Sequence, residues 1–189
     1  MKEIIIIAGP NGSGKSTLAS QLDIQGYFIS ADDCEKRYFA DISDRDEREK
    51  RAIVMVAKEI QSSISQGKSF AFETVFSSDE IPAFLEKAKV NGYSITLHFI
   101  ATESPKINIE RVAKRVKQGG HDVPKDKIIS RYEKSLLILP KLIEFSTKAF
   151  IYDNSKEKLR PFLVKENNQI KTIGTIPEWA KELILYFKF

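Results

Sequence analysis

Residues Ile4 to Thr17 read IIIIAGPNGSGKST, and this stretch decides the fold. The apolar, β-branched run from Lys2 to Ala8 is typical of a strand buried on both faces. The residues after it fit the pattern G-x-x-x-x-G-K-[ST] at every fixed position. Lys15 to Leu22 then has the apolar spacing of a short helix. In this context the glycine-rich turn points backbone N–H groups at phosphate oxygens, and the helix adds the positive end of its dipole.

We therefore predict a phosphate-binding loop for ATP or GTP. Its predicted residues are Gly9, Pro10, Asn11, Gly12, Ser13, Gly14, Lys15, Ser16 and Thr17. We expect Lys15 to reach the β- and γ-phosphates and the Ser16 hydroxyl to bind Mg²⁺. The alternative is a tight turn that merely contains these residues, and the agreement of motif and context favours the phosphate loop.

Beyond this loop, strands alternate with helices along the chain, which predicts an α/β fold with a parallel sheet covered on both faces. The predicted strands are Lys2 to Ala8, Tyr27 to Ser30, Ser69 to Thr74, Tyr93 to Ile100 and Lys148 to Tyr152. The predicted helices are Lys15 to Leu22, Ser43 to Ser65, Asp79 to Val90, Pro105 to Gln118, Lys125 to Glu144 and Pro177 to Phe187.

The sequence thus predicts one domain with the three-layer P-loop NTPase fold and a mostly parallel, five-stranded sheet. Its core is expected at about 1–155. Residues 156–189 are expected to add a polar-faced hairpin, with its turn around Asn167-Asn168, and a C-terminal helix. Pro140 is expected to kink the helix that contains it. We interpret the charged residues Asp44 to Arg51 as a solvated helix face.

Composition favours a cytoplasmic protein with small anionic ligands. Of 189 residues, 42% are hydrophobic and 30% are charged, and the single cysteine, Cys34, excludes an intrachain disulfide. No apolar run is long enough for a signal peptide or a membrane span. The net charge of +4 suits either nucleic acid or small phosphate compounds. Without a dense Lys/Arg block, we favour the small compounds and expect no nucleic-acid or membrane partner.

Among P-loop proteins, the small-molecule kinases fit best. The chain lacks the L-S-G-G-Q signature of ABC ATPases, an apolar strand that ends in Asp-Glu, and the N-K-x-D sequence of GTPases. In the kinases that remain, strand ends beside the phosphate loop build the acceptor site.

Two strand ends offer carboxylates for that site. Asp32 and Asp33 follow the second strand, where a carboxylate can accept a hydroxyl proton or hold a water of the metal. Capping of the following helix is the alternative. Glu73 and Thr74 end a buried strand, where a carboxylate needs a partner, either substrate or metal, or else a structural salt bridge.

A group of arginines follows. Arg111 and Arg115 are one helical turn apart, and Arg131 lies beyond Gly119-Gly120. Guanidinium groups can close over a transferring phosphoryl group, and the glycine pair offers a hinge. Solvated helix arginines are the alternative. His121 is either a ligand-facing donor or a plain loop residue.

These motifs together resemble the zeta-toxin-like P-loop kinases. The resemblance covers Ile4 to about Ser155 and is carried by AGPNGSGKST, the aspartate after the second strand, FET, RVAKRVKQGGHDVP, ISRYEKSL and YDNS. It is strongest to a short bacterial subgroup labelled predicted ABC-type ATPases, a label that the missing signature argues against.

The resemblance implies phosphotransfer from ATP to a hydroxyl group, which in zeta toxins belongs to UDP-N-acetylglucosamine. It also implies a small antitoxin as partner. Lys15 would be the phosphate-loop lysine and Asp32 the catalytic base. Arg115 and Arg131 would bind the phosphates, while Asp33, Glu73, Thr74, Arg111 and His121 are candidates for acceptor binding. A polynucleotide kinase or RNA-associated ATPase, and an ATP-binding module without turnover, stay open as alternatives.

Overall fold

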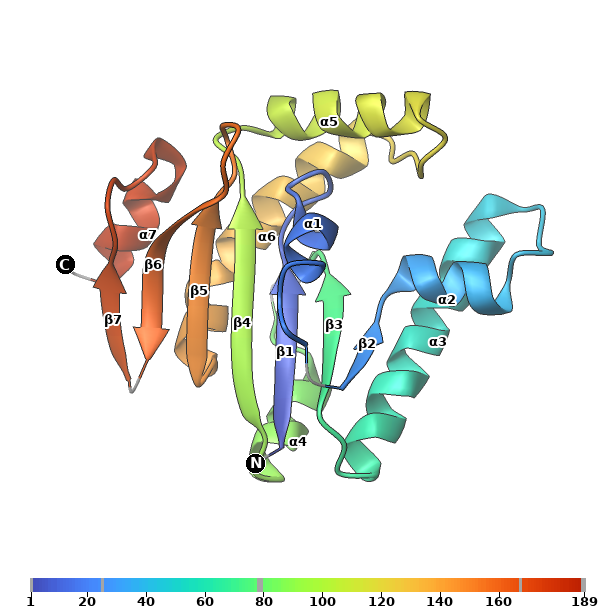
Figure 1. The fold of residues 1–189 in the computed structure, drawn as a ribbon, viewed down its shortest axis with the longest axis horizontal. Helices are drawn as coiled ribbons and strands as arrows, with labels where there is room; N and C mark the ends of the chain where they lie inside the picture. Colours follow the sequence, from blue (N-terminus) through green and yellow to red (C-terminus); the bar gives the residue numbers. More distant parts are fainter. Residues whose placement is uncertain (1, 25, 78–79, 167, 188–189) are drawn as a thin grey trace.

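The computed structural model describes residues 2–24, 26–77, 80–166 and 168–187. The start of the helix predicted at Asp79 and the turn residue Asn167 lie outside these ranges. Within them the chain forms one twisted sheet with helices on both sides (Figure 1).

The described chain contributes seven strands to this sheet, in the order β2-β3-β1-β4-β5-β6-β7. They are β1 Glu3–Ala8, β2 Tyr27–Ile29, β3 Phe70–Thr74, β4 Ser94–Ala101, β5 Lys148–Asp153, β6 Arg160–Glu166 and β7 Gln169–Thr172. The first five pair in parallel, and the last two are antiparallel. The α/β class and the mostly parallel sheet are confirmed.

The predicted number of five strands is wrong, because the C-terminal hairpin extends the sheet. β6 pairs with β5 from Ala149↔Lys165 to Asp153↔Arg160, and β7 follows at the edge. The hairpin is also less polar than predicted. Phe162 and Leu163 are almost fully buried and join the main core, which fixes β6 against the rest of the protein.

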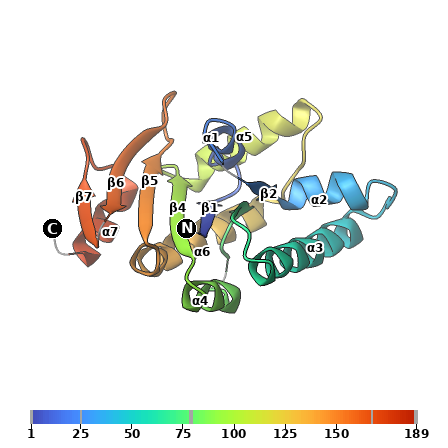
Figure 2. The same ribbon diagram turned by 60° about the horizontal axis from the view of Figure 1, so that its bottom comes forward.

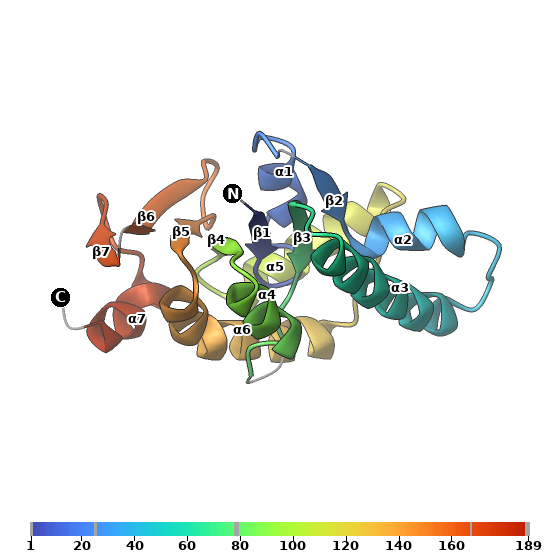
Figure 3. The same ribbon diagram turned by 90° about the horizontal axis from the view of Figure 1, so that it is seen from below.

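The described helices are α1 Lys15–Ala19, α2 Ala31–Tyr38, α3 Arg45–Ser65, α4 Ala83–Val90, α5 Pro105–Lys117, α6 Lys125–Phe145, the 3₁₀ turn η1 Glu178–Ala180 and α7 Lys181–Tyr186. Seen from below, α1 lies on one face of the sheet, while α4, α6 and α7 lie on the other (Figure 3). α2 and α3 extend beyond β2 at the sheet edge (Figure 2). α6 continues through Pro140 without ending.

α2 is a helix that the sequence analysis did not predict. Ser30 caps it: its Oγ accepts from the Asp33 backbone N–H at 3.1 Å and donates to Asp33 Oδ2 at 2.8 Å. The first bond is an N-cap, and the second joins the two side chains; the pattern S-x-x-D, which is typical of a helix start, is present in the sequence as Ser30 to Asp33. The cap is therefore made by Ser30, with Asp33 as its partner.

Within the described residues, no helix is both long enough and apolar enough to cross a lipid bilayer. The carboxyl ends of the parallel strands meet at one edge of the sheet, at the top in Figure 1. That edge also carries the loop between β1 and α1 and the helix α5, so it is where a ligand site can form.

Candidate active site around Lys15

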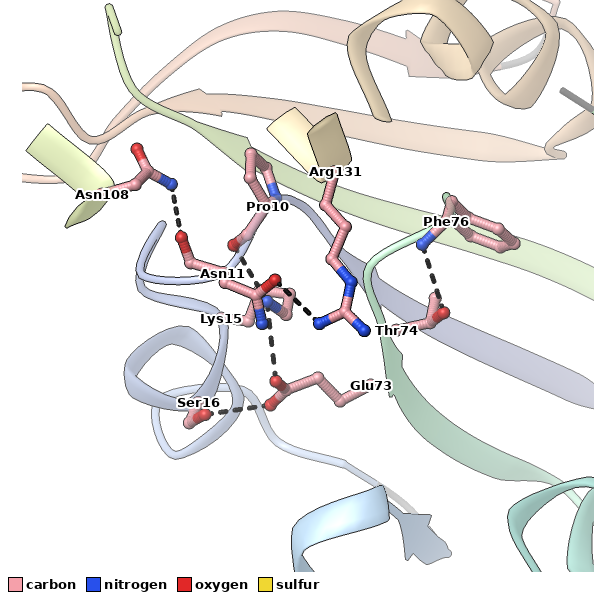
Figure 4. Close-up of polar contacts among 9 residues, drawn as sticks. All are labelled: Pro10, Asn11, Lys15, Ser16, Glu73, Thr74, Phe76, Asn108 and Arg131. Carbon is pink, nitrogen blue, oxygen red and sulfur yellow. Dashed lines mark hydrogen bonds and ion pairs between the residues drawn. The ribbon is translucent and has the colours of Figure 1, made fainter. Parts of the chain in front are cut away.

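Lys15 is folded back onto the loop that precedes it. Its Nζ donates a hydrogen bond to the Pro10 carbonyl at 3.0 Å and lies 3.7 Å from Glu73 Oε1 at the end of β3 (Figure 4). Only 6% of the residue is exposed. The loop between β1 and α1 and the tip of β3 thus enclose one ammonium group, which needs an anion beside it.

Burial lowers the pKa of Lys15, and the neighbouring charges act on it in both directions. Glu73 and Asp32 raise this pKa, while Arg115 and Arg131 lower it. These four predicted site residues therefore lie close enough to Lys15 to interact with its charge, although they belong to β3, α2, α5 and α6. The sheet edge brings them together.

Glu73 also contacts the residue after Lys15. Ser16 Oγ donates to Glu73 Oε2 at 3.0 Å (Figure 4). A hydroxyl and a carboxylate beside a phosphate loop fit Mg²⁺, which takes oxygen ligands and fills most positions with water and substrate phosphates. Among the residues that the structure describes, no group of three or more His, Cys, Asp or Glu could hold a metal ion.

α5 fixes the phosphate loop from above. Asn108 is fully buried, and its Nδ2 donates to the Asn11 carbonyl at 2.6 Å, while its Oδ1 accepts from the Thr102 hydroxyl. A Cβ on Gly12, where φ is +76°, would lie 2.7 Å from the Asn108 carbonyl oxygen. Asn108 was not among the predicted site residues. It could have been found because its polar amide lies on the same buried face of α5 as Val112, where an apolar side chain would be expected.

α6 and α3 meet at the other side of the loop. Arg131 donates to Asn11 Oδ1 at 3.3 Å and lies 3.5 Å from Glu49 Oε1. Arg45 contacts His121 Nε2 at 3.3 Å and also donates to the Asp122 carbonyl. The interpretation of this part of α3 as a solvated face holds for Asp44, Asp46, Lys50 and Arg51, which are exposed. It fails for Arg45 and Glu49, which are half-buried by these contacts.

Arg115 has an unused donor. Its Nε is buried and has no hydrogen-bond partner among the described residues. Gly120 permits the position of the side chain, since a Cβ there would lie 2.5 Å from Arg115 Cγ. A buried guanidinium N–H without a partner is costly, so it points to an anion that completes the site.

Two cavities flank the phosphate loop. The first, of about 480 Å³, is lined by Gly12, Gly14, Thr17, Arg111, Arg115 and Asn154, among others. The second, of about 600 Å³, is lined by Lys15, Ser16, Asp32, Glu73, Arg115 and Arg131, among others. Arg115 lines both, so the two cavities approach each other at this side chain.

The second cavity contains most of the residues predicted for the acceptor. Asp32, Asp33, Glu73, Thr74 and His121 all line it, whereas Arg111 lines the first cavity. Asn154 was missed: its Nδ2 donates to the Ser13 carbonyl at 2.7 Å. It follows the end of β5, so the rule that drew attention to Asp32 and Glu73 could have found it.

A parallel sheet with a G-x-x-x-x-G-K-S loop at its carboxyl edge, and helix arginines over that loop, defines a P-loop kinase fold. The particular family follows from comparison with known proteins. A family model described as "Zeta toxin" matches residues 1–159, so the chain belongs to the zeta toxin family.

Three relatives illustrate the similarity. An uncharacterized protein of Haemophilus influenzae is 32% identical over 135 residues, covering 68% of this chain and 91% of that protein. The structure of the PezAT chromosomal toxin–antitoxin system of Streptococcus pneumoniae aligns with a TM-score of 0.59 and 17% identity, over 100% of this chain and 80% of that one. The crystal structure of AvrRxo1-ORF1:-ORF2 with ATP aligns with a TM-score of 0.71 and 13% identity, over 100% of this chain and 63% of that one. The two structural likenesses support the fold.

Proposed function

We propose that this protein transfers the γ-phosphoryl group of ATP to a hydroxyl group of a small acceptor. The observation that carries the proposal is the pair of cavities on either side of the phosphate loop, with Arg115 in the lining of both. A nucleoside in the first cavity would direct its phosphates past Lys15. A hydroxyl group in the second would then face the terminal phosphate.

In the proposed reaction, Asp32 accepts the proton of the acceptor hydroxyl while the acceptor oxygen forms its bond to the γ-phosphorus. The bond between that phosphorus and the bridging oxygen breaks, and ADP leaves with the electron pair. Lys15, Arg115 and Arg131 offset the charge that develops on the transferring group. The buried Nε of Arg115, which has no partner among the described residues, is suited to this task.

Magnesium belongs to the same proposal. When bound, Mg²⁺ neutralises charge on the β- and γ-phosphates. Ser16 Oγ would hold it directly and Glu73 through water. Once phosphates and metal are present, Lys15 can exchange the Pro10 carbonyl for phosphate oxygens, and Glu73 can exchange Ser16 for the metal's water.

The family resemblance adds finer expectations. It offers UDP-N-acetylglucosamine as a first candidate for the acceptor and a small antitoxin protein as a partner that holds the kinase inactive. The single cysteine, in turn, favours action in the reducing cytoplasm. An antitoxin that blocks one of the two cavities would be enough to silence the transfer.

The substitution Asp32→Asn tests the proposal. Loss of a general base costs about 10²- to 10⁴-fold in rate, whereas the phosphate contacts remain, so Mg-ATP binding should stay within about twofold of the parent. The measurement is mass spectrometry of a metabolite extract incubated with enzyme and labelled ATP, with ATP affinity from calorimetry. Separate arms contain UDP-sugars, nucleosides, NAD and oligonucleotides.

Asp33→Asn is the matched control. Asp33 lines the same cavity, but its carboxylate accepts a hydrogen bond from Ser30, so its loss should reduce kcat far less than the loss of Asp32. If Asp32→Asn kept near-normal transfer, the base assignment would be wrong. Stimulation by oligonucleotide ends alone would favour a polynucleotide kinase instead.

A further inference from the structure

One wall of the second cavity is apolar. α3 contributes Ile53, Val56, Ala57 and Ile60, and Phe72 and Phe84 add a wall of aromatic rings whose centroids lie 5.8 Å apart. The spacing of the α3 residues is that of one helix face. A face of this kind normally packs into the core of the protein.

Only part of this face does so, since Ile60 and Val56 pack in the main core. Ile60 is 3% exposed, whereas Ile53, two turns earlier, is 55% exposed although it lines the cavity. Val54 is equally exposed, at 56%, but lies outside the cavity lining. Ile53 therefore lies beside the buried stripe of α3, to which Ala52 and Ile60 belong, and lines the cavity where the described protein leaves it uncovered. Apolar walls with a few converging polar groups are typical of sites for small ligands.

Three of the four Lys and Arg residues of the described lining lie at the phosphate loop. Lys15 donates to the Pro10 carbonyl and Arg131 to the Asn11 side chain, and Arg115 lines the cavities on both sides of the loop. These three are needed for the phosphates of ATP. The remaining Lys or Arg of the lining is Lys36, an exposed residue of α2.

The lining of the second cavity also contains carboxylates, and more of them than Lys36 alone could neutralise. Glu73 and Glu49 are paired with Lys15 and Arg131, and Glu35 lies 3.4 Å from Arg48. Asp32 and Asp33 remain, in the first turn of α2. They already occupy the positive end of that helix dipole. A second phosphate chain bound here would face these two carboxylates with Lys36 as its main counter-charge.

From this distribution we infer that the acceptor is an alcohol without phosphate groups that carries an apolar ring or branched apolar group, such as a nucleoside or an aryl alcohol. This rests on the proposed function and narrows its substrate class, against the UDP-sugar that the family resemblance suggests. The apolar group lies along Ile53 and Val56. The hydroxyl group points to Asp32 and the phosphate loop.

The test compares phosphate-free and diphosphate acceptors on matched variants. Uridine, other nucleosides and a panel of neutral aryl alcohols form one set, and UDP-N-acetylglucosamine and NAD form the other. Product formation is followed with labelled ATP, and binding is followed by ligand-observed NMR. The variants are Ile53→Ser and, as a control of equal exposure outside the cavity, Val54→Ser. Both side chains are exposed, so both proteins should fold with unchanged Tm.

We expect at least one phosphate-free alcohol to bind and to be phosphorylated. Ile53→Ser should raise its KM at least fivefold and leave the KM of ATP unchanged, and Val54→Ser should change neither. UDP-N-acetylglucosamine should react at least a hundredfold less efficiently.

Other outcomes separate the two proposals. Efficient transfer to a diphosphate acceptor, with a KM raised by Lys36→Ala and unaffected by Ile53→Ser, would overturn this inference and uphold the kinase. Binding of a phosphate-free alcohol that Ile53→Ser weakens, with no transfer to any compound, would uphold the inference on the cavity and contradict the kinase. Failure of every phosphate-free compound to bind would overturn the inference.

Discussion

At the scale of single residues, Glu73 provides the negative charge beside the buried ammonium group of Lys15. The Lys15 ammonium donates to the Pro10 carbonyl and lies 3.7 Å from Glu73 Oε1. Burial favours the neutral amine, and Glu73 opposes that tendency. The same carboxylate accepts a hydrogen bond from the Ser16 hydroxyl. Glu73 therefore orients both Lys15 and Ser16, which the predicted ATP site requires.

His98 makes a residue-scale prediction about pH. It stacks on Phe150 with ring centroids 5.0 Å apart, and its Nδ1 lies 3.0 Å from the Tyr152 hydroxyl. Burial lowers its pKa from 6.5 to about 4, against a smaller opposing effect of Glu3. Between pH 6.5 and about 4, His98 is therefore protonated in the unfolded chain but mostly neutral in the folded protein. The stability contributed by neutral His98 is complete above pH 6.5 and is lost as pH falls towards 4.

At 1.36 kcal/mol per pKa unit, this loss amounts to about 3 kcal/mol. Urea unfolding between pH 7 and pH 4 should therefore show a shallower decline in the free energy of unfolding for His98→Gln than for the parent. Equal slopes for His98→Gln and the parent would show that His98 is not held neutral by the fold.

The residue scale also shows what the sequence could predict. The phosphate loop could be predicted from the sequence because its residues are consecutive along the chain. The contact between Arg131 and Glu49 spans 82 positions, and its partners are ordinary helix residues. Arg131 could be predicted as a site residue from the family resemblance, but no local pattern marks Glu49 as its partner. The roles of all these residues in catalysis stay predictions.

At the scale of elements, the loop between α5 and α6 is built around Arg115. The backbone N–H groups of Gln118 and Gly120 both donate to the Arg115 carbonyl at 3.0 Å. The absence of a side chain at position 120 leaves room for the arginine stem. This tight turn holds Arg115 where it lines both cavities, and the hinge at the glycine pair stays a prediction.

Gly120→Ala should therefore displace Arg115. We expect phosphoryl transfer to fall at least tenfold with little change in the free energy of unfolding, because the guanidinium loses its position while the turn remains. Transfer rate and urea unfolding are the measurements. Gly119→Ala is the control: its φ of +81° makes a side chain strained, but open space surrounds the position. It should cost about 1 kcal/mol of stability and little activity. The reverse pattern in the two variants would contradict the account.

Element boundaries were predictable where periodicity was strong. The helices α3, α5 and α6 and the parallel strands lie close to their predicted ranges. α2 was missed because it has only eight residues and one buried side chain, Cys34, so no apolar stripe marks it. The pairing of β6 with β5 was missed for a different reason. Whether a hairpin joins a sheet depends on tertiary packing of residues such as Phe162, which propensity does not encode.

At the scale of the whole molecule, Asp153 connects the C-terminal segment to the phosphate loop. Its carboxylate accepts from Trp179 Nε1 at 3.1 Å and from Arg160 at 2.7 Å, and also from Ser155. Burial raises its pKa, but these hydrogen bonds outweigh burial and hold the pKa below its usual value. The next residue, Asn154, bonds the carbonyl of Ser13 in the loop.

Asp153→Asn should weaken both ends of this connection. Hydrogen bonds to a charged group are worth roughly 1.5–3 kcal/mol, so we expect the free energy of unfolding to fall by about 2–3 kcal/mol. ATP affinity should fall several-fold, because Asn154 is less firmly placed. Urea unfolding and calorimetry measure the two effects. Glu166→Gln, at the exposed end of β6, should change neither, and an unchanged ATP affinity in Asp153→Asn would refute the connection to the loop.

The central claim of this account is that the backbone between β1 and α1 binds the phosphates of ATP and that Lys15 completes that site. The most direct measurement is calorimetric titration of Mg-ATP into the parent protein and into Lys15→Ala, with folding of both verified by thermal unfolding. We predict saturable binding to the parent and a loss of at least a hundredfold in affinity for the variant. Equal affinity of the two proteins for Mg-ATP, or no binding of any nucleoside triphosphate to the parent, would contradict the claim.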